Sequence, residues 1–350
     1  MATDVGLSRA TFAKLSPHPY LLANLDPSTD DVPPGRSNGR TPNEVRTPTV
    51  NQSSLSHAHG SAVVRTGDTT VICGVRGETL VTSAIPKYRA SNRATELRDY
   101  DLIVPNIELA TGASPQFLPG GPPTTLAQTL STRIYSLLHS SKLIDPADLR
   151  IWHTRPAEEA EAAAAAAAAA TGADEMEEDN DDDEDDGESR EDVVAYWVLY
   201  IDIFFVSFDG NPFDAAWAAT LAALRDTALP RARFDPDREL VICSRKDPRP
   251  LAISRNPIAC TAVVFTGKET DRPTEGGRFW LLVDPDALEE SLCDESLTVV
   301  VDCSGGKTEI LSVSKHGGTN LGPKLLASDE FLQWTGQRWK GFVDVIGGQA

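Results

Sequence analysis

The apolar and polar residues of 45–85 alternate with the two-residue period of β-strands. Two runs rich in β-branched residues, 60–65 and 69–75, flank the glycine-containing segment 66–68. A short turn of this kind between two alternating runs predicts a β-hairpin. A further strand is expected over 102–109. The first third of the chain therefore predicts a sheet.

The residues around these strands predict helices and loops. Residues 1–25 indicate a short amphipathic helix and an extended arm, and 26–44 are rich in Pro, Gly, Ser and Asn, as loops are. Residues 86–101 are polar and predict an exposed loop. A longer helix is expected after Thr124, which can serve as its N-cap. Its apolar residues recur at helical spacing, namely Leu126, Leu130, Ile134, Leu137 and Leu138.

Residues 196–208 form a nearly unbroken apolar run that is rich in β-formers and too short to cross a membrane. The run predicts a central strand covered on both faces. The Asp-Gly-Asn-Pro segment 209–212 predicts a turn, and Asp214 is expected to cap the helix after it. Alanines between positions 215 and 223 give this helix a small face for close packing, and Leu229-Pro230 ends it.

The last third of the chain repeats the order of several strands followed by a helix. Strand-like segments lie at 239–244, 250–254, 258–266, 279–284 and 297–303, and another lies near 308–314. A helix is expected near 323–335. Strands followed by a helix in both halves indicate an α+β fold of mixed sheets with helices and an internal pseudo-duplication, instead of alternating βαβ units.

An insertion dominates the charge of the chain, whose formal net charge is −20. Residues 157–192 hold 17 acidic residues against one basic residue, so the remainder carries only −4. Nine alanines, Ala162–Ala170, precede the acidic run 174–186, which repels itself and has almost nothing to bury. Residues 156–192 are therefore expected to be a disordered Ala-rich and acidic insertion. The alternative is an acidic chaperone for basic partners. A near-neutral body leaves RNA binding open.

The cysteines and histidines indicate neither disulfides nor a metal site. None of the five cysteines forms a CxxC pair, and Cys73, Cys243 and Cys260 lie in apolar runs, so reduced core thiols are expected. His57 and His59 lack a partner at ligand spacing. We therefore expect no metal and no cofactor. No run approaches the ~20 apolar residues of a membrane helix, and no signal-peptide pattern is seen. These features predict a soluble intracellular protein with no membrane contact.

The motifs of several enzyme classes are missing. The chain has no phosphate-binding GxxxxGK[ST], no dinucleotide-binding GxGxxG and no nucleophile-elbow GxSxG. Asp202, Asp209 and Asp214 are the carboxylates clustered around the apolar strand. We interpret them as structural, on a strand face, in a turn and at a helix end, with acid–base chemistry as the alternative.

Four groups of residues resemble motifs of the RNase PH family, in the same order along the chain. They are the RxxGRxxxExR pattern at 36–46, the hairpin at 60–71, the strand–turn–helix segment 202–230, and Pro257, Thr261, Asp284-Pro285 and Glu289-Glu290 in the second half. The resemblance implies the RNase PH fold (ribosomal protein S5 domain 2-like). It also implies an N-terminal arm at 1–35 and a single domain at 36–345 that the insertion interrupts.

Within this family the chain is most similar to the exosome ring subunits that lack activity, through 104–108, 114–117, 121–123 and 256–261. Active members place an acidic residue shortly before the second-half proline motif, which assists proton transfer at the leaving 3′ oxygen. Residues 252–257 contain no carboxylate, and Arg255 stands near that position. We therefore assign no catalytic residue.

The fragment Ser131-Thr132-Arg133 has the composition of a phosphate pocket but is expected in the middle of a helix. Packing or solvent exposure is the preferred interpretation of its side chains. The alternative to an inactive subunit is an active phosphate-dependent 3′ exoribonuclease.

The resemblance implies a hetero-oligomer, in which RNase PH-like subunits form a six-membered ring beneath S1/KH cap subunits and RNA threads the channel. The expected role is structural support of 3′-to-5′ RNA processing and degradation, including rRNA maturation and mRNA turnover. The expected locations are the nucleus and nucleolus, and also the cytoplasm. Four residues are candidate RNA-binding cations in the loop 86–101: Lys87, Arg89, Arg93 and Arg98. An ordinary solvated loop is the alternative.

Overall fold

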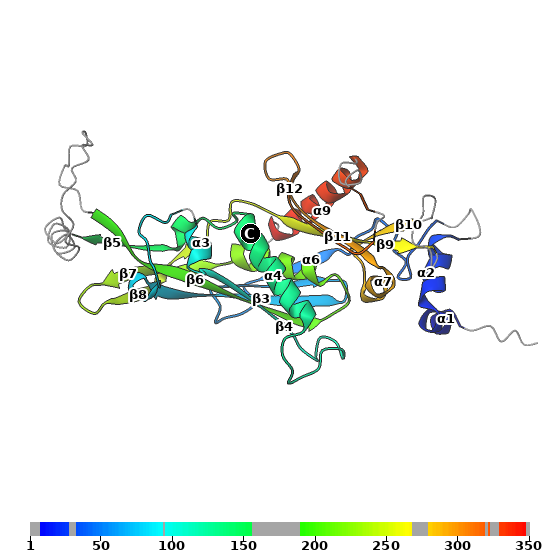
Figure 1. Ribbon diagram of the computed structural model, residues 1–350, viewed down its shortest axis with the longest axis horizontal. Coiled ribbons are helices and arrows are strands. Elements are labelled where there is room, and N and C mark those ends of the chain that lie inside the picture. The colour runs from blue at the N-terminus through cyan, green and yellow to red at the C-terminus, as the bar shows by residue number, and fades with distance from the viewer. Residues whose placement is uncertain are drawn as a thin grey trace, which may run out of the picture.

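The computed structural model describes residues 8–27, 33–93, 95–155, 190–267, 279–318, 321–322 and 329–347. These residues form an elongated molecule with a six-stranded sheet, a four-stranded sheet and a two-stranded sheet (Figure 1). Most of the insertion expected at 156–192 lies outside the described residues. Its last three positions do not, because strand β6 already begins at Arg190.

The first sheet has the strand order β1-β2-β3-β6-β4, and β5 pairs with β6. Its strands are β1 (Pro48–Gln52), β2 (Gly60–Thr66), β3 (Thr69–Val81), β4 (Ile103–Leu109), β5 (Arg150–Arg155) and β6 (Arg190–Ser207). β2 and β3 pair antiparallel on either side of Gly67, whose φ is 61°, a conformation that glycine adopts without strain. The predicted hairpin is confirmed.

Two helices pack against the inner face of this sheet. α4 (Thr125–Ser140) begins at Thr124, whose side chain accepts a hydrogen bond from the N–H of Ala127, as the sequence predicts. α6 (Pro212–Arg225) is buried along almost its whole length. Its alanines allow it to lie close to β2 and β3, which confirms the predicted small-residue face.

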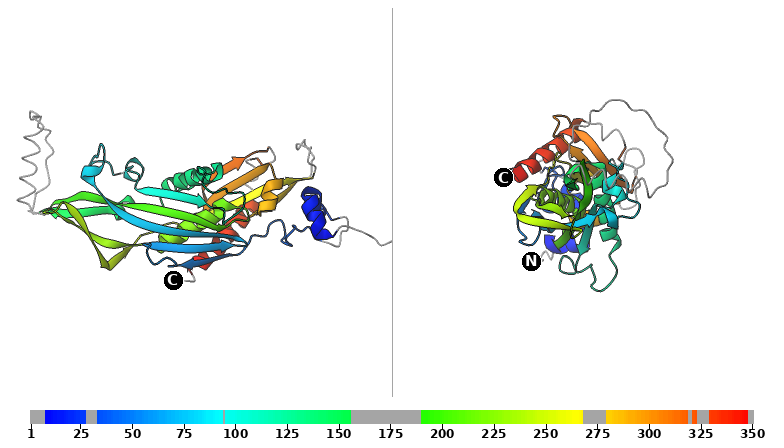
Figure 2. Two further views of the ribbon diagram at one scale, coloured as in Figure 1. Left: turned by 90° about the horizontal axis from the view of Figure 1, so that it is seen from below. Right: turned by 90° about the vertical axis from the view of Figure 1, so that its left-hand side faces the viewer.

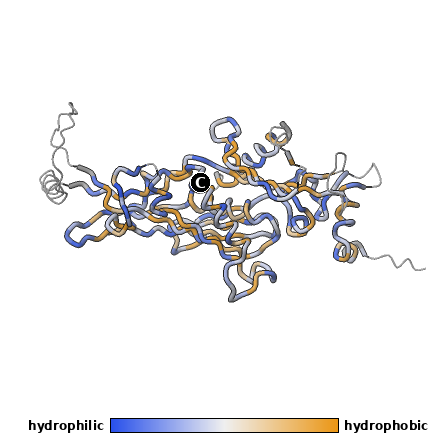
Figure 3. Tube along the Cα trace, in the orientation of Figure 1, coloured by the Kyte–Doolittle hydropathy of each residue, from blue (hydrophilic) through white to orange (hydrophobic). Residues whose placement is uncertain are grey.

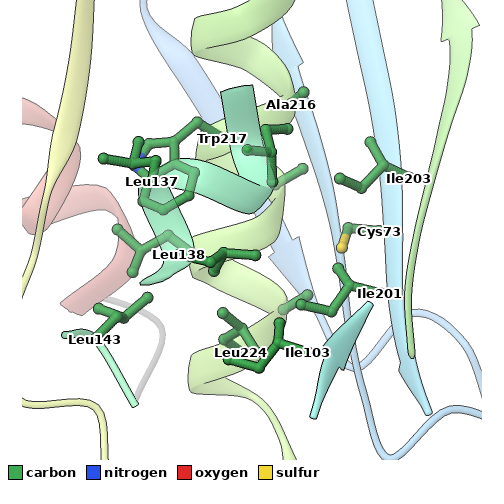
Figure 4. Packing of buried hydrophobic residues seen from close by; sticks show 14 of the residues in the cluster. Cys73, Ile103, Leu137, Leu138, Leu143, Ile201, Ile203, Ala216, Trp217 and Leu224 are labelled. Carbon is green, nitrogen blue, oxygen red and sulfur yellow. The ribbon is translucent and has the colours of Figure 1, made fainter. Parts of the chain in front are cut away.

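The main core lies between these helices and the sheet. Figure 4 shows Trp217 of α6 beside Leu137 and Leu138 of α4, with Cys73 and Ile201 on the sheet side. All five side chains are at most 3% exposed. The apolar segments of the chain collect along these strands and helices, while the periphery is hydrophilic (Figure 3).

Strand β6 lies between β3 and β4, but only its first half is covered on both faces. Val194–Leu199 is buried throughout, whereas buried and exposed residues alternate from Ile201 onward. Phe204 and Val206 are 39% and 42% exposed. The prediction of a doubly covered strand is wrong for this second half, because α4 and α6 pack against the other face.

The second sheet has the order β10-β9-β11-β12, and all its pairs are antiparallel. Its elements are β9 (Ile258–Thr266), β10 (Phe279–Val283), α7 (Ala287–Leu292), β11 (Glu295–Asp302), β12 (Glu309–His316) and α9 (Asp329–Gly347). Four predicted strands are confirmed here. α7 has no counterpart in the prediction, and α9 ends well beyond the expected 335.

A two-stranded ribbon, β7 (Ala228–Asp235) and β8 (Leu240–Pro250), projects from the body. The sequence did not predict β7, and α6 ends at Arg225, before the Leu-Pro pair that was expected to end it. The strand expected at 250–254 is wrong, since β8 stops at Pro250 and Ile253 makes one isolated bridge. Cys243 is exposed on this ribbon, so its expected core position is also wrong, whereas Cys73 and Cys260 are buried.

The short helix expected within residues 1–25 is present as two helices, and the second packs against the second sheet. Two helices follow each other, α1 (Arg9–Leu15) and α2 (Pro17–Leu25). Leu21 and Leu25 pack against Val263, Phe265 and Leu282. Short helices also occur in the connections, namely η1 (Thr82–Ala84), α3 (Glu96–Asp99) and η2 (Pro146–Leu149). No described helix is long and apolar enough to span a bilayer.

Candidate functional site

Arginines and carboxylates gather where the two sheets meet, near the start of α6. Asp284, directly after β10, is fully buried. Arg46 donates three hydrogen bonds to its carboxylate, one from the backbone at 2.8 Å and two from the guanidinium at 3.0 and 2.8 Å. Burial by itself would raise the pKa of Asp284. The hydrogen bonds from Arg46 and the charges of Arg338 and Arg46 instead hold the pKa of this carboxyl well below its usual range.

A second buried ion pair fastens the segment 36–46 to α7. The guanidinium of Arg36 makes two hydrogen bonds to the carboxylate of Glu289. Arg36 also donates to the carbonyl of Val283 at 2.6 Å. Glu289 closes a capping box with Asp286 at the start of α7. The RxxGRxxxExR segment therefore joins the first sheet to the second.

The first turn of α6 is crowded with carboxylates. Asn211 precedes the helix in the left-handed conformation and donates to Asp214 at 3.0 Å and to Asp284 at 2.7 Å. Asp214 accepts hydrogen bonds from the N–H and hydroxyl of Thr261 and from Arg338. The expectation that Asp214 caps α6 is wrong. It lies within the first turn and binds β9 and α9, because its side chain faces the second sheet.

Glu290 of α7 completes this cluster by accepting the N–H of Asn211 at 2.7 Å. Burial raises the pKa of Glu290 to about 7. Asp209 begins the turn before α6, as predicted, and its carboxylate lies 3.6 Å from Arg46. Asp202 is exposed on β6. The structure thus brings Asp209 and Asp214 into one network and leaves Asp202 on the sheet surface.

A cavity of about 240 Å³ lies between α4, the start of α6 and the second sheet. Arg133 lines it, with its guanidinium 3.9 Å from the ring centre of Phe213. Burial lowers the pKa of Arg133. The hydroxyls of Ser131 and Thr132 bond to backbone carbonyls instead of lining the cavity. Arg133 is therefore the one member of the 131–133 fragment that reaches the cavity.

Arg255, which stands near the position where active family members have an acidic residue, is half-buried and lies 3.4 Å from Glu309. The backbone beside it is fixed by two tryptophans. Trp217 donates to the carbonyl of Pro257 at 2.7 Å, and Trp339 donates to that of Asn256 at 2.7 Å. In the described residues, no group of three His, Cys, Asp or Glu is arranged to hold a metal.

The four candidate RNA-binding residues, Lys87, Arg89, Arg93 and Arg98, are all exposed. We call them the basic loop. Glu96, 1% exposed, anchors the loop from below by accepting hydrogen bonds from Arg150 and Tyr196. Tyr88 and Tyr100 form an aromatic cluster with Tyr196, so they pack within the protein. The loop thus presents its cations outward from a fixed base.

Sequence reasoning missed Arg338, Asn211 and Glu290 as members of the cluster. Arg338 reaches Asp214 across 124 positions of the chain, and Asn211 reaches Asp284 across 73. A single sequence contains no periodicity that reports contacts of this range. The turn predicted at 209–212 gave the one usable signal, because Asn tolerates the left-handed conformation in turns.

The raised pKa of Glu290 predicts how stability depends on pH. The folded protein holds a proton on Glu290 up to about pH 7, whereas the unfolded chain releases it near pH 4.3. The unfolded state therefore binds fewer protons in this window, and stability falls as pH rises through it. Glu290→Gln keeps the oxygen that accepts from Asn211 but cannot ionise. We expect the variant to gain about 2–3 kcal/mol over the wild type between pH 4.5 and pH 7.5.

Urea unfolding at several pH values measures this difference. Glu108→Gln, on the exposed surface of β4, is the matched control and should follow the wild type at every pH. Parallel stability curves for the wild type and Glu290→Gln would contradict the predicted linkage.

Comparisons with known proteins identify the family to which this architecture belongs. Residues 44–230 match the first domain of the 3′ exoribonuclease family, and 256–327 match its second domain. The chain is 32% identical over 323 residues to exosome complex component rrp43 of Schizosaccharomyces pombe, covering 92% of this chain and 93% of that relative. It is 30% identical over 280 residues to exosome complex component Rrp42 of Methanopyrus kandleri, covering 80% and 79%.

A solved structure agrees with these relatives. A chain of the Archaeoglobus fulgidus exosome with RNA bound to the active site superimposes with a TM-score of 0.60 and 25% identity, over 92% of this chain and 96% of that one. The expected RNase PH fold and the resemblance to exosome ring subunits are confirmed. The chain belongs to the 3′ exoribonuclease family, as a homologue of the RNase PH-like subunits of exosome cores.

Proposed function

We propose that the chain is a non-catalytic, structural subunit of an exosome ring, supporting 3′-to-5′ RNA processing and degradation such as rRNA maturation and mRNA turnover. The relatives named exosome components support the assembly. The observation that carries the non-catalytic part is the first turn of α6, where Glu290, Asp214 and Asp284 surround Asn211.

Phosphorolysis needs a site that holds inorganic phosphate. Helix N-termini favour anions because their backbone N–H groups and dipole point outward. At α6 the chain's own carboxylates take that place: Glu290 accepts the N–H of Asn211, and Asp214 lies in the first turn. Pro212 has no N–H to offer. A phosphate here would meet the carboxyl oxygens of Glu290 and Asp214 instead of free donors.

Two of the nearby cations are already paired. Arg46 binds Asp284 and Arg338 binds Asp214. Neither is free to neutralise phosphate without leaving a buried carboxylate uncompensated, which is costly. Arg255 stands near the position where active family members have an acidic residue, and its charge has the opposite sign. Together these features support a subunit without phosphorolytic activity.

The open face of the first sheet supports an assembly role. Phe204 and Val206 are exposed there, and Ile72, which pairs with Phe204, is only partly buried. Tyr200 on the same face carries the guanidinium of Arg76 at 5.5 Å from its ring centre. Contiguous exposed apolar groups of this kind mark protein–protein interfaces. A neighbouring RNase PH-like subunit of a six-membered ring would cover them.

The wider setting follows from the proposed ring. The partners are other RNase PH-like subunits, an S1/KH cap subunit and RNA threading the channel. The locations are the nucleus and nucleolus, and also the cytoplasm, where RNA is processed and degraded. The N-terminal segment 1–35 and the domain 36–345 act in this proposal as one ring-forming unit.

One observation favours the alternative, an active phosphate-dependent 3′ exoribonuclease. Among the described residues, Arg133 lines the cavity beside α6 without an ion pair. A phosphate oxygen could approach it there, although Glu290 lines the same cavity. This second candidate therefore makes Arg133 the residue to test.

Incubation of the purified chain with a 5′-labelled oligo(A) and inorganic phosphate tests the proposal. We expect no nucleoside diphosphate. Release of nucleoside diphosphate that needs phosphate and disappears in Arg133→Gln would establish the alternative. Release that persists in Arg133→Gln would point to a contaminating enzyme and would be checked against a mock purification.

The basic loop is proposed to contact RNA through phosphates. Replacing its four cations by glutamine is expected to weaken single-stranded RNA binding and to lower the salt slope by about 3, since each lost contact with a single strand changes the slope by roughly 0.7. Fluorescence anisotropy with a labelled oligo(A) between about 50 and 200 mM salt measures both effects.

A control variant removes four solvent-accessible cations elsewhere, three of them exposed and one half-buried. These are Arg65, Arg76, Lys142 and Arg255. The control should bind RNA more tightly, and with a steeper salt dependence, than the basic-loop variant. Equal affinity and slope in the two variants would show that the loop is an ordinary solvated surface.

A further inference from the structure

The ribbon of β7 and β8 presents a cationic and apolar outer face. Paired residues of the two strands lie on the same side, so Arg231 and Arg233 share this face with Ser244 and Ile242. Both arginines are exposed, and Ile242 and Leu240 are 42% and 59% exposed. The opposite face carries Ala232 and Phe234, which pack on the core. The outer face is therefore uncovered among the described residues.

The charge of this ribbon is unusual in so acidic a chain. Residues 228–250 hold six basic and four acidic residues, whereas the whole chain outside 157–192 carries a net charge of −4. Arg238 and Asp235 lie 4.0 Å apart at the tip. Arg231 and Arg233 make no hydrogen bond or ion pair with the described part of the chain. Their charges are left for another partner.

The described residues on either side of the segment 156–189, which contains the acidic run, lie at the same end of the molecule as this ribbon. β5 and β6 pair through Arg155 opposite Arg190, at the two ends of the segment 156–189. Two residues earlier in β5, His153 packs on Phe234 of β7, with ring centres 5.6 Å apart. Figure 2 shows the ends of β5 and β6 and the ribbon at the same end of the molecule.

We propose that the outer face of the ribbon docks the acidic run 174–186 of this same chain. The run holds 11 acidic residues in 13 positions. Asp186 is four positions from Arg190, so its Cα lies within roughly 14 Å of the start of β6. The 18 residues between Arg155 and Asp174 can span at most about 60 Å, so chain length allows the other end of the run to reach the ribbon.

An RNA strand is the competing polyanion for this face. A tethered segment has an effective concentration in the millimolar range. Non-specific binding of nucleic acid at physiological salt has dissociation constants of about 10⁻⁴ to 10⁻⁶ M. The acidic run is tethered to the same chain and is always available at this effective concentration. RNA would have to reach a comparable, millimolar concentration to compete at equal affinity. The geometry therefore favours the acidic run as the resident occupant.

Carbodiimide cross-linking of the full chain, read by mass spectrometry, tests the docking. This reagent joins a carboxylate to a lysine amine in direct contact. Lys246 is the lysine of the ribbon, and Lys142 is an exposed control lysine after α4. We expect cross-links from 174–186 to Lys246 at least about tenfold over those to Lys142, and their loss at about 1 M salt, where charges are screened within about 3 Å.

Matched charge reversals make the test specific. Arg231→Glu with Arg233→Glu should reduce the Lys246 cross-links at least about fivefold, because it removes the cations of the outer face. Arg65→Glu with Arg76→Glu changes the net charge equally at exposed positions outside the ribbon and should leave these cross-links unchanged. Equal labelling of Lys246 and Lys142, or cross-links indifferent to the ribbon reversal, would overturn the proposal.

RNA binding identifies the competing occupant. Two results together would show that the outer face of the ribbon binds RNA instead of the acidic run. They are the absence of a Lys246 cross-link in the full chain and weaker oligo(A) binding by the ribbon reversal. The proposal would then fail. Neither result bears on ring assembly, because the docking involves only this chain. The proposal therefore stands or falls separately from the proposed function.

Discussion

Replacing Asp284 by alanine is expected to lower the free energy of unfolding by about 3–5 kcal/mol, the range seen when one partner of a buried ion pair is removed. Asp284 is fully buried and accepts three hydrogen bonds from Arg46 and one from Asn211. Its loss leaves the Arg46 guanidinium, whose side chain is only 10% exposed, without its main counter-charge. The damage falls where the two sheets meet, so both should loosen together.

Urea unfolding followed by tryptophan fluorescence measures this loss. Asp202→Ala on the open face of β6 is the control, and it should change stability by less than about 1 kcal/mol because that carboxylate is exposed. The lowered pKa of Asp284 adds a pH signature. Its contribution to stability is present above the unfolded pKa near 3.9 and is lost as pH falls further. A loss for Asp284→Ala no larger than the control would contradict the structural role of this cluster.

Replacing Trp217 by alanine is expected to cost about 3–5 kcal/mol, the usual range for truncating a large aromatic side chain in a core. Trp217 is 1% exposed and lies at the centre of the main core (Figure 4). Its indole also donates to the carbonyl of Pro257 at 2.7 Å, which ties α6 to the start of β9. The substitution therefore removes both packing between α4 and α6 and a bond between the two halves.

Two further variants separate these contributions. Trp217→Phe keeps most of the packing but removes the indole donor. Its expected loss of stability is about 1–3 kcal/mol, the cost of leaving the carbonyl of Pro257 unsatisfied. This loss should be smaller than that of the alanine variant. Leu118→Ala, at a position 80% exposed, should be nearly neutral. Equal losses for Trp217→Ala and Leu118→Ala in chemical unfolding would show that this core does not hold the fold.

Local signals in the sequence predicted the elements whose causes are local. The hairpin at 66–68 needs only a turn glycine between alternating strands, and α4 needs only Thr124 before its apolar repeat. β9 through β12 follow from runs of β-formers. In each case the physical reason for the element lies within a few neighbouring residues.

The failures share a different cause, which is tertiary contact. The run 196–208 is almost uniformly apolar in sequence. In the second half of the strand, however, α4 and α6 cover only one face. No local sequence pattern predicts which face stays open. β7 begins three residues after the end of α6, at Ala228. Its Leu229-Pro230 pair was therefore interpreted as the end of the helix. Cys243 lies in an apolar run, yet that run belongs to a ribbon that projects from the body.

The candidate site shows the same limit. The family motifs identified Arg36, Asp214 and Glu289 as important positions, but not their partners. Asp214 looked like a cap because it follows a turn, whereas its acceptor oxygens are used by Thr261 and Arg338. Partner choice depended on the approach of the second sheet, which becomes visible only in the folded molecule.

Native mass spectrometry of the tagged chain, purified from its own cells at low salt, tests the central claim most directly. The account predicts a hetero-oligomer in which this chain is present with other RNase PH-like subunits. It also predicts that Phe204→Glu with Val206→Glu, on the open sheet face, releases the chain from that assembly. A stable monomer of the unaltered chain would contradict the proposal that it is a ring subunit.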